Sequence, residues 1–446
     1  KQEILDVTSG RRIQKMGGQQ MDTIETMTRI DSGAFDEAFG YLYSEKAQEQ
    51  RARYKNAALQ FETLFGAGRE IRLFSAPGRT EVGGNHTDHQ HGRVLAAGVN
   101  LDVIAVASKN DDRIIRIKSE GFPMDVVDLS DLSARDDEPN TAAALIRGVA
   151  ARLAALGCPL QGAGLDAYVV SNVPGGSGLS SSAAFEVLLG TILNNLFFDG
   201  KCTGLDIAAA GQYAEHTFFK KPCGLMDQLT SAAGNLVAIN LTEPDQVVLH
   251  PVSFDFFSCG HALCMVDSRA SHAGLTSEYA AIPQEMKILS GYFDKELLSQ
   301  VAESEFYAAI PALRSLAGDR AVLRAIHFYQ EDKRVPEQVA ALEAGDFDKF
   351  LRLVRLSGYS SYMYLQNVIP TGAVAHQELG LTLALCEHYL AGRGAYRVHG
   401  GGFAGTIQAF VPDAIVPRYK ANIETVFGKD TCHVLKIRPD GGRKVL

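Results

Sequence analysis

Residues Val173–Ala184 read VPGGSGLSSSAA, and the expected organisation of the chain follows from this stretch. A β-branched run at Tyr168–Val170 precedes it and an apolar helical pattern begins at Phe185, so we expect a strand, a glycine-rich loop and the start of a helix. Glycines let a backbone turn sharply and approach a ligand, while a helix N-terminus offers unpaired N–H groups and a positive dipole end. Together with three serine hydroxyls, these groups predict an anion site, and phosphate is the favoured anion.

The alternative for this loop is a Ser/Gly segment that only caps a helix. Three glycines and three serines between a strand and a helix favour phosphate over that alternative. The loop is not a Walker A sequence, because no Gly-Lys-Ser/Thr follows the glycines, and it lacks the G-x-G-x-x-G spacing of a dinucleotide fold. A serine hydroxyl beside phosphate oxygens can also bind Mg²⁺.

Bulk properties exclude several classes of function. The 446 residues suffice for two or three domains, and a net charge of −9 without a Lys/Arg block argues against nucleic-acid or anionic-membrane partners. Seven scattered cysteines without a C-x-x-C pair disfavour a disulfide framework or structural zinc and fit a reducing cytoplasm. The longest apolar run, Val94–Ala107, is broken by Asn100 and Asp102, and the N-terminus lacks an apolar signal region. We therefore expect a cytoplasmic protein.

The order of expected elements predicts an α+β fold in two lobes, because helices and strands alternate without a βαβ period. We expect an N-terminal extension over residues 1–48, a first lobe over 49–260 and a second lobe over 261–446. Within the extension, Asp22–Ile30 and Phe35–Tyr43 are expected helices. A mobile arm and a packed accessory segment are both open for this extension.

A second polar motif, Asn85–His89, follows an expected strand. Asp88 can accept hydrogen bonds from two adjacent hydroxyls of a polyol, His86 can donate to another, and Arg79 is a fixed cation suited to a transferring phosphoryl group. Metal binding by the histidines is the alternative. It is disfavoured because H-x-x-H-x-H on a loop lacks the i,i+4 helical geometry of the usual zinc pairs.

Four segments, in order, resemble those of the GHMP small-molecule kinases, and in particular the galactokinase branch. Pro174–Ala184 is similar to P-x-x-x-G-L-S-S-S-A, and Ala76–His89 to A-P-G-R-V-N-L-I-G-E-H-T-D-Y. Gly224–Gln228 is similar to G-I-M-D-Q, and Gly400–Thr406 to G-G-G-F-G-G-C. The similarity extends from about residue 50 to Gly442. It implies a GHMP kinase fold with a ribosomal-protein-S5-like N-terminal lobe and a ferredoxin-like C-terminal lobe.

The resemblance also implies roles for individual residues. Asp227 matches the catalytic aspartate and Arg79 the arginine beside it, while Ser182 and Glu215 match the residues linked to Mg²⁺. The positions that match the ATP phosphate loop are Gly175, Gly176, Ser177, Gly178, Leu179, Ser180, Ser181 and Ser182. The positions that match sugar-binding residues are Asn85, His86, Thr87, Asp88, Gly224 and Tyr279, with Gly401, Gly402 and Phe403 in support.

Each of these roles has a structural alternative. Asp227 could be a helix cap, Glu215 a solvated helix residue, and Tyr279 an interface aromatic. The glycines near residue 400 could serve only tight packing between the lobes.

Departures from the family pattern gather on the sugar side. Asn85 replaces a glutamate expected near the C6 hydroxyl, Glu81 replaces an asparagine, and His89 replaces a tyrosine. Asparagine brings no negative charge, so it would tolerate a carboxylate at C6. The H-T-D-H-Q-H-G segment also resembles H-I-D-H-Q-G-G of galacturonate kinases.

The expected function is an ATP- and Mg²⁺-dependent kinase that phosphorylates the anomeric hydroxyl of galactose. The first alternative is a kinase for galacturonate or another C6-modified galactose-type sugar. A second is an inactive, galactokinase-like sensor of sugar and ATP, disfavoured because the serine loop and Asp227 are intact. A third, a mevalonate or homoserine kinase, is disfavoured by His86–Asp88 and Met226–Gln228. The sequence predicts small-molecule partners, no nucleic acid and no membrane, and it leaves the oligomeric state open, with a monomer compatible.

Overall fold

The computed structural model of this chain describes residues 21–44, 47–160, 162, 164–221, 223–243, 247–256, 258–271 and 273–445. The first 20 residues of the predicted N-terminal extension, and its residues 45–46, lie outside the described residues.

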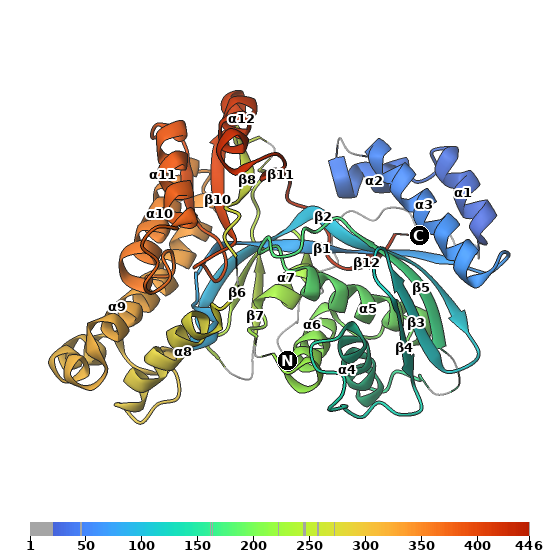
Figure 1. Cartoon of the computed structure of the whole chain (residues 1–446), viewed down its shortest axis with the longest axis horizontal. Helices are drawn as coiled ribbons and strands as arrows, with labels where there is room; N and C mark the ends of the chain where they lie inside the picture. Colours follow the sequence, from blue (N-terminus) through green and yellow to red (C-terminus); the bar gives the residue numbers. More distant parts are fainter. Residues whose placement is uncertain are drawn as a thin grey trace.

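A sheet of eight strands carries the first part of the chain (Figure 1). Its strand order is β12-β1-β2-β5-β3-β4, and β6 and β7 extend it beside the first half of β2. β3 pairs with β5 in parallel, and the other neighbouring strands of this sheet are antiparallel. The strands are β1 (Arg72–Gly83), β2 (Arg93–Asn110), β3 (Ile114–Ser119), β4 (Met124–Asp128), β5 (Gly164–Ser171), β6 (Leu236–Asn240), β7 (Val248–Pro251) and β12 (Arg443–Lys444).

Helices cover both faces of this sheet (Figure 1). On one face lie α4 (Ala142–Ala155), α5 (Ser181–Phe197), α6 (Gly204–Ala214) and α7 (Met226–Ala233), and on the other α1 (Thr23–Asp31), α2 (Asp36–Tyr43) and α3 (Ala47–Phe65). Along β2 the side chains alternate: Val103 and Ala105 pack in the core beside α4–α6, and Ile104 and Val106 in the core beside α1–α3. The long apolar run of the sequence is therefore one strand buried on both faces.

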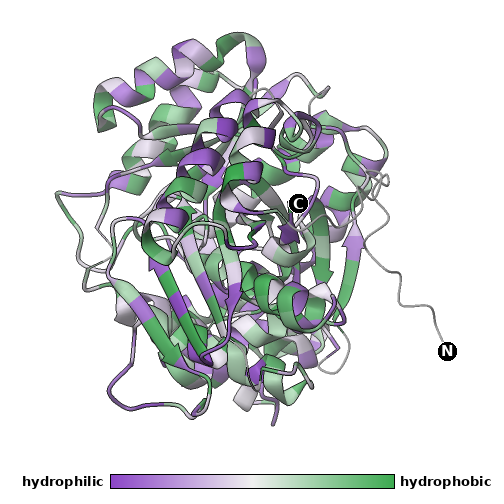
Figure 2. Ribbon diagram, turned by 90° about the vertical axis from the view of Figure 1, so that its right-hand side faces the viewer, coloured by the Kyte–Doolittle hydropathy of each residue, from purple (hydrophilic) through white to green (hydrophobic). Residues whose placement is uncertain are grey.

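A second sheet of four antiparallel strands, in the order β11-β8-β10-β9, lies beside the first. Its strands are β8 (His261–Asp267), β9 (Ala395–Val398), β10 (Thr406–Pro412) and β11 (Cys432–Leu435). The helices of this part are α8 (Thr276–Gly291), α9 (Glu303–Glu343), α10 (Phe347–Ser360), α11 (Glu378–Leu390) and α12 (Val416–Phe427). Figure 2 shows hydrophobic and hydrophilic residues interspersed along the helices. The α+β fold predicted from the sequence is confirmed, and it contains these two sheets.

The described part of the N-terminal extension is packed on the sheet. For these residues the alternative of a packed accessory segment therefore holds, and that of a mobile arm does not. Phe35, Phe39 and Tyr43 are almost fully buried, because α2 lies against α3 and the sheet. The Tyr43 hydroxyl donates to Asp102 Oδ2 over 2.6 Å. Arg53 Nη1 donates to the other oxygen of that carboxylate over 2.5 Å, and Arg438 Nη1 to Oδ2 over 3.0 Å. One buried carboxylate thus joins α2, α3, β2 and the C-terminal segment.

We expect Tyr43→Phe to lower the free energy of unfolding by about 1.5–3 kcal/mol at neutral pH, because it removes a hydrogen bond to a buried charge. Burial raises the pKa of Asp102, but the charges of Arg53 and Arg438 outweigh it and hold that pKa below its ordinary value. A depressed folded-state pKa contributes stability above the unfolded pKa of about 3.9, and this contribution is lost as the pH falls through the folded value.

Urea unfolding at pH 7 and at steps below pH 4 checks this prediction. The gap between the natural protein and Tyr43→Phe should narrow in acid. Tyr41→Phe is the matched control, since its hydroxyl bonds the part-buried Asp440 over 3.2 Å. An equal loss of unfolding free energy in Tyr43→Phe and Tyr41→Phe would contradict the role given to Asp102.

Candidate active site

The glycine–serine loop leads from β5 into α5, as the sequence predicts. Gly176 and Gly178 both have φ of 72°, which favours glycine, and a Cβ at Gly175 or Gly176 would meet only open space. Ser180, the N-cap of α5, makes no capping hydrogen bond with its side chain, and the first helical bond runs from Ala184 N to Ser180 O. The preceding N–H groups of the first turn therefore have no helical acceptor, and such groups at a helix N-terminus suit an anion.

Residues from both sheets hold this loop. Arg79 N donates to Leu179 O over 2.9 Å, and the Thr406 hydroxyl at the start of β10 donates to Ser177 O over 2.9 Å. A Cβ at Gly178 would press on His399 and Thr406, so this position suits only glycine. The loop is fixed at its base and open at its tip.

Arg79 and Asp227 meet directly beside the loop. Arg79 lies on β1 and Asp227 in the first turn of α7, 148 residues apart in sequence. Arg79 Nε and Nη2 donate to Asp227 Oδ1 and Oδ2, each over 2.6 Å, and Arg79 Nη1 donates to Gly178 O. The Ser180 hydroxyl donates to Asp227 Oδ2 over 2.6 Å. One ion pair thus connects β1, α7 and the N-terminus of α5.

Asp227 does not act as a helix cap, because the N-cap of α7 is Leu225 and the Asp227 carboxylate turns to Arg79 and Ser180. Burial raises the pKa of Asp227, but the Arg79 charge and hydrogen bonds, helped by Ser180, bring it below its ordinary value. The carboxylate is therefore ionised at neutral pH. Its side chain stays 28% exposed, so it is open to a ligand.

Glu215 lies in a π-helical turn, η3 (Glu215–Phe219), that follows α6. π-Helical turns often mark functional sites. The Glu215 side chain is only 3% exposed, so the alternative of a solvated helix residue is wrong. Its Oε1 pairs with Lys221 Nζ over 3.3 Å. Ser182 occupies the first turn of α5.

His86 contacts the glycine loop after β9. Its backbone φ is 59°, and its Nε2 lies 3.0 Å from Gly401 O. Burial, with smaller effects from neighbouring charges, lowers the pKa of His86 to about 3, so the ring is neutral. With Nε2–H donating to Gly401, Nδ1 is an acceptor, and it has no hydrogen-bond partner among the described residues. His86 can therefore accept a hydrogen bond from a ligand hydroxyl.

Asp88 and Gly224 face one another. Asp88 opens a short 3₁₀ turn, η2 (Asp88–Gln90), and its Oδ1 accepts from His89 N over 3.0 Å. Its Oδ2 points at Gly224, where a Cβ would overlap it. Thr87 is fully buried, and its hydroxyl bonds Gly84 O and Arg93 O over 2.8 and 2.6 Å. Thr87 shapes the turn that presents Asp88.

Asn85 is fully buried, and protein groups use its whole amide. Nδ2 donates to Glu81 Oε1 over 3.0 Å and to Gly400 O over 2.7 Å. Oδ1 accepts from Ser361 over 3.1 Å and from Asn367 over 2.9 Å. An amide makes about four hydrogen bonds, so Asn85 has none left for a sugar in this structure. Its place is in the wall of the site.

Tyr279 of α8 packs on the same glycine loop. Its hydroxyl donates to Gly402 O over 3.0 Å, and its ring meets that of Phe403 edge-on at 5.5 Å. A Cβ at Gly401 would strike the Tyr279 ring, and one at Gly402 would overlap Asn367, so both positions need glycine. Burial raises the pKa of Tyr279 to about 12, which keeps its hydroxyl protonated.

Several residues of this wall were not predicted. Asn367, Ser361 of the π-helical turn η5 (Ser361–Leu365), and His327 of α9 all bond Asn85. Glu331, one turn after His327, accepts from Gly84 N over 3.1 Å. A sequence signal existed for two of them, because His327 and Glu331 are four residues apart and so share one face of a helix. Both are fully buried in the structure.

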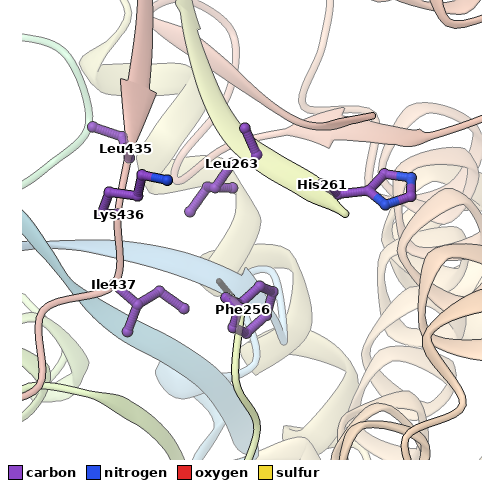
Figure 3. Close-up of a pocket in the computed structure, with 7 residues that line it drawn as sticks. Phe256, His261, Leu263, Leu435, Lys436 and Ile437 are labelled. Atoms are coloured by element: carbon purple, nitrogen blue, oxygen red, sulfur yellow. The ribbon is translucent and has the colours of Figure 1, made fainter. Parts of the chain in front are cut away.

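A small pocket elsewhere is unrelated to this cluster (Figure 3). It lies between β8, β11 and the segment before β8, and its lining includes Phe256, His261, Leu263, Leu435 and Ile437. None of the predicted site residues lines it. In the described part of the chain, no three His, Cys, Asp or Glu side chains gather to hold a metal by themselves.

A glycine–serine loop at a helix entrance beside an aspartate–arginine pair, on this two-sheet scaffold, is the arrangement expected of the small-molecule kinases of the GHMP class. The model "GHMP kinases N terminal domain" matches residues 144–235, and the model "Galactokinase galactose-binding signature" matches residues 59–109. A galactokinase of Actinobacillus pleuropneumoniae is 31% identical over 84% of this chain and 94% of the relative. A galactokinase of Streptomyces coelicolor is also 31% identical, over 87% and 97%. The chain belongs to the galactokinase family.

Solved structures agree on the fold. Galactokinase of Lactococcus lactis, complexed with galactose, superposes with a TM-score of 0.74 at 24% identity, covering 88% of this chain and all of that one. A mevalonate kinase of L. major superposes less well, with a TM-score of 0.56 at 14% identity, over 84% of this chain and 97% of that one. Among the described residues, no helix has the length and apolar character of a membrane span.

Proposed function

We propose that this chain transfers the γ-phosphoryl group of ATP to the C1 hydroxyl of galactose, giving galactose 1-phosphate and ADP. The observation that carries the proposal is the Arg79–Asp227–Ser180 cluster at the entrance of α5. It puts an ionised carboxylate, a fixed cation and a phosphate-type loop within hydrogen-bonding distance of one another. Phosphoryl transfer depends mainly on such positioning and charge stabilisation.

Asp227 is proposed to accept the hydrogen bond of the C1 hydroxyl and take its proton as the new P–O bond forms. A carboxylate offers about four acceptor positions, and Arg79 and Ser180 use three of them, which leaves one on Oδ1. Arg79 orients the carboxylate, keeps it charged before the reaction, and lies where it can stabilise the phosphoryl oxygens. ADP leaves as the bridging oxygen takes the negative charge.

Residues Gly175–Ser182 are proposed to bind the ATP phosphates, and Ser182 and Glu215 to hold Mg²⁺. Hydroxyl and carboxylate oxygens are the ligands that this ion prefers, and Mg²⁺ is usually held by one or two carboxylates plus substrate phosphates. The site fits such a cation, because the fully buried Glu186 beside Glu215 has an Oε1 atom without a hydrogen-bond partner in the described residues. When bound, Mg²⁺ would supply charge neutralisation at the transferring phosphate.

On the sugar side, His86 Nδ1 and the Asp88 carboxylate are proposed to bind hydroxyls, with Gly224 leaving room for Asp88. Tyr279, Thr87 and Asn85 are proposed to shape the wall. Asn85 brings no negative charge near C6, but it has no unused N–H to hold a C6 carboxylate, and galactose is therefore the proposed substrate.

We expect Gly224→Ala to raise KM for galactose by about tenfold with a smaller change in kcat, because the added methyl group displaces Asp88 from its binding position. Steady-state kinetics with saturating ATP measure both constants. Gly204→Ala is the control, since a Cβ there meets atoms only at 3.7 Å or beyond. An unchanged KM would remove Asp88 and Gly224 from the sugar site.

A coupled ADP-release assay over a panel of galactose, galacturonate, glucose, N-acetylgalactosamine and arabinose tests the proposed function. The expected result is the highest kcat/KM for galactose and little turnover of galacturonate. A preference for galacturonate would overturn the choice of sugar. The absence of sugar-dependent ADP release would favour the inactive sensor instead.

A further inference from the structure

A pair of buried carboxylates with a single nearby ammonium lies next to the proposed Mg²⁺ position. Glu186 of α5 is fully buried, and Glu215 is nearly so. Gln228 Nε2 donates to Glu186 Oε2 over 3.0 Å, and Glu186 Oε1 has no hydrogen-bond partner among the described residues. The cation against this pair is Lys221, with Nζ 3.3 Å from Glu215 Oε1. Burial and the charge of Glu215 raise the pKa of Glu186, so the two carboxyl groups need a proton or a cation between them.

The backbone fixes Lys221 at this place while its head stays free to move. Lys220 adopts the left-handed conformation that ends η3, with φ of 66°. The Lys221 N–H then donates back to Glu215 O over 2.9 Å. The Lys221 side chain is nevertheless 54% exposed, so its ammonium can change partner without moving the backbone.

The same ammonium also acts on the catalytic centre. Its charge is among those that lower the pKa of Asp227, and it adds to the larger effect of Arg79. Lys221 is thus a cation that pairs with the proposed metal ligand and acts through its charge on the proposed catalytic carboxylate. A lysine head group is a compact point charge on a flexible stem, which suits a phosphate that arrives and leaves.

We propose that Lys221 is a partner-exchanging phosphate ligand: it neutralises Glu215 in the nucleotide-free protein and turns to the γ-phosphoryl oxygens when Mg·ATP binds. The inference rests on the proposed function, since it needs Glu215 as a Mg²⁺ ligand. The physical reason is competition, because one carboxylate oxygen cannot hold an ammonium and a divalent cation together without strong repulsion between the two. The displaced ammonium then lies where transferring phosphate needs positive charge.

The test compares Lys221→Met with Lys220→Met, a control that removes the same charge one residue earlier, and with Lys221→Arg, which keeps the charge. Two binding measurements are made on each protein. Mn²⁺ binding to the nucleotide-free protein is followed by electron paramagnetic resonance. Calorimetry gives the affinities for ADP and for a non-hydrolysable ATP analogue, both with Mg²⁺.

For Lys221→Met we expect Mn²⁺ to bind several-fold more tightly, because its competitor for Glu215 is gone. We also expect the ATP analogue to bind about tenfold more weakly while ADP changes little, because the lost contact is to the γ-phosphate. Lys220→Met should match the natural protein, and Lys221→Arg should recover most of the affinity for the analogue. A merely structural lysine would weaken all three ligands together.

Unchanged Mn²⁺ and analogue affinities in Lys221→Met would overturn the inference, as would equal losses for ADP and the analogue. A natural protein that binds neither nucleotide would instead overturn the proposed function. The two failures are therefore distinguishable.

Discussion

Asp227→Asn is expected to lower kcat by about a thousandfold while the affinity for ATP stays within about twofold of the natural protein. The amide nearly preserves the shape of the carboxylate, but it cannot take the proton of the C1 hydroxyl. It also leaves the buried Arg79 guanidinium without its counter-charge. The phosphate loop is held separately, by Arg79 N and Thr406, so nucleotide binding should survive.

Single-turnover kinetics and calorimetry on the same preparation measure the two halves of this prediction. Asp206→Asn is the matched control. Asp206 only caps the start of α6 together with Thr203, so its change should cost stability and not turnover. Retention of more than about a tenth of the natural kcat in Asp227→Asn would remove this residue from the proton-transfer role.

Asn85→Glu is expected to lower the free energy of unfolding by about 3–5 kcal/mol, because it buries a second carboxylate against Glu81 and removes the donor that Glu81 and Gly400 O now share. This outcome bears on the substrate as well. A variant designed to repel a C6 carboxylate would first be unstable, so its kinetics alone could not report on the sugar.

Exchanging the two side chains, Asn85→Glu together with Glu81→Asn, tests the same network more strictly. Glu81 pairs with the buried Arg397, so Glu81→Asn alone should also be destabilising. In the double variant, one carboxylate and one amide remain at exchanged positions, and the total loss should be smaller than the sum of the two single losses by about 1–3 kcal/mol. Urea unfolding of the four proteins gives this coupling energy. Strictly additive losses would contradict a shared Glu81–Asn85 network.

The sequence predicted the elements that carry a local signature. The glycine and serine spacing of Val173–Ala184 predicted the strand, loop and helix start, and Arg79 and Asp227 do lie beside that loop. The expected helices Asp22–Ile30 and Phe35–Tyr43 correspond to α1 and α2. These features depend on backbone rules that act over a few residues.

The sequence could not predict what depends on long-range packing. The sequence predicted that Asn85 contacts the sugar. A motif shows the charge of a residue, but it does not show which side chains surround that residue in the folded protein. Here the partners Ser361 and Asn367 come from more than 270 residues away. The burial of Asp102 was missed for the same reason: in the sequence it only interrupts an apolar run, and its partners include Tyr43, Arg53 and Arg438, which are distant in the sequence.

The central claim is that the ATP phosphates and the C1 hydroxyl of the sugar meet between the entrance of α5 and the Arg79–Asp227 pair. A crystal structure with galactose and a non-hydrolysable ATP analogue tests it most directly. The predicted result is O1 of galactose about 2.6–3.2 Å from an Asp227 oxygen, with the triphosphate against Gly175–Ser182. A sugar or triphosphate bound away from these residues would contradict the claim.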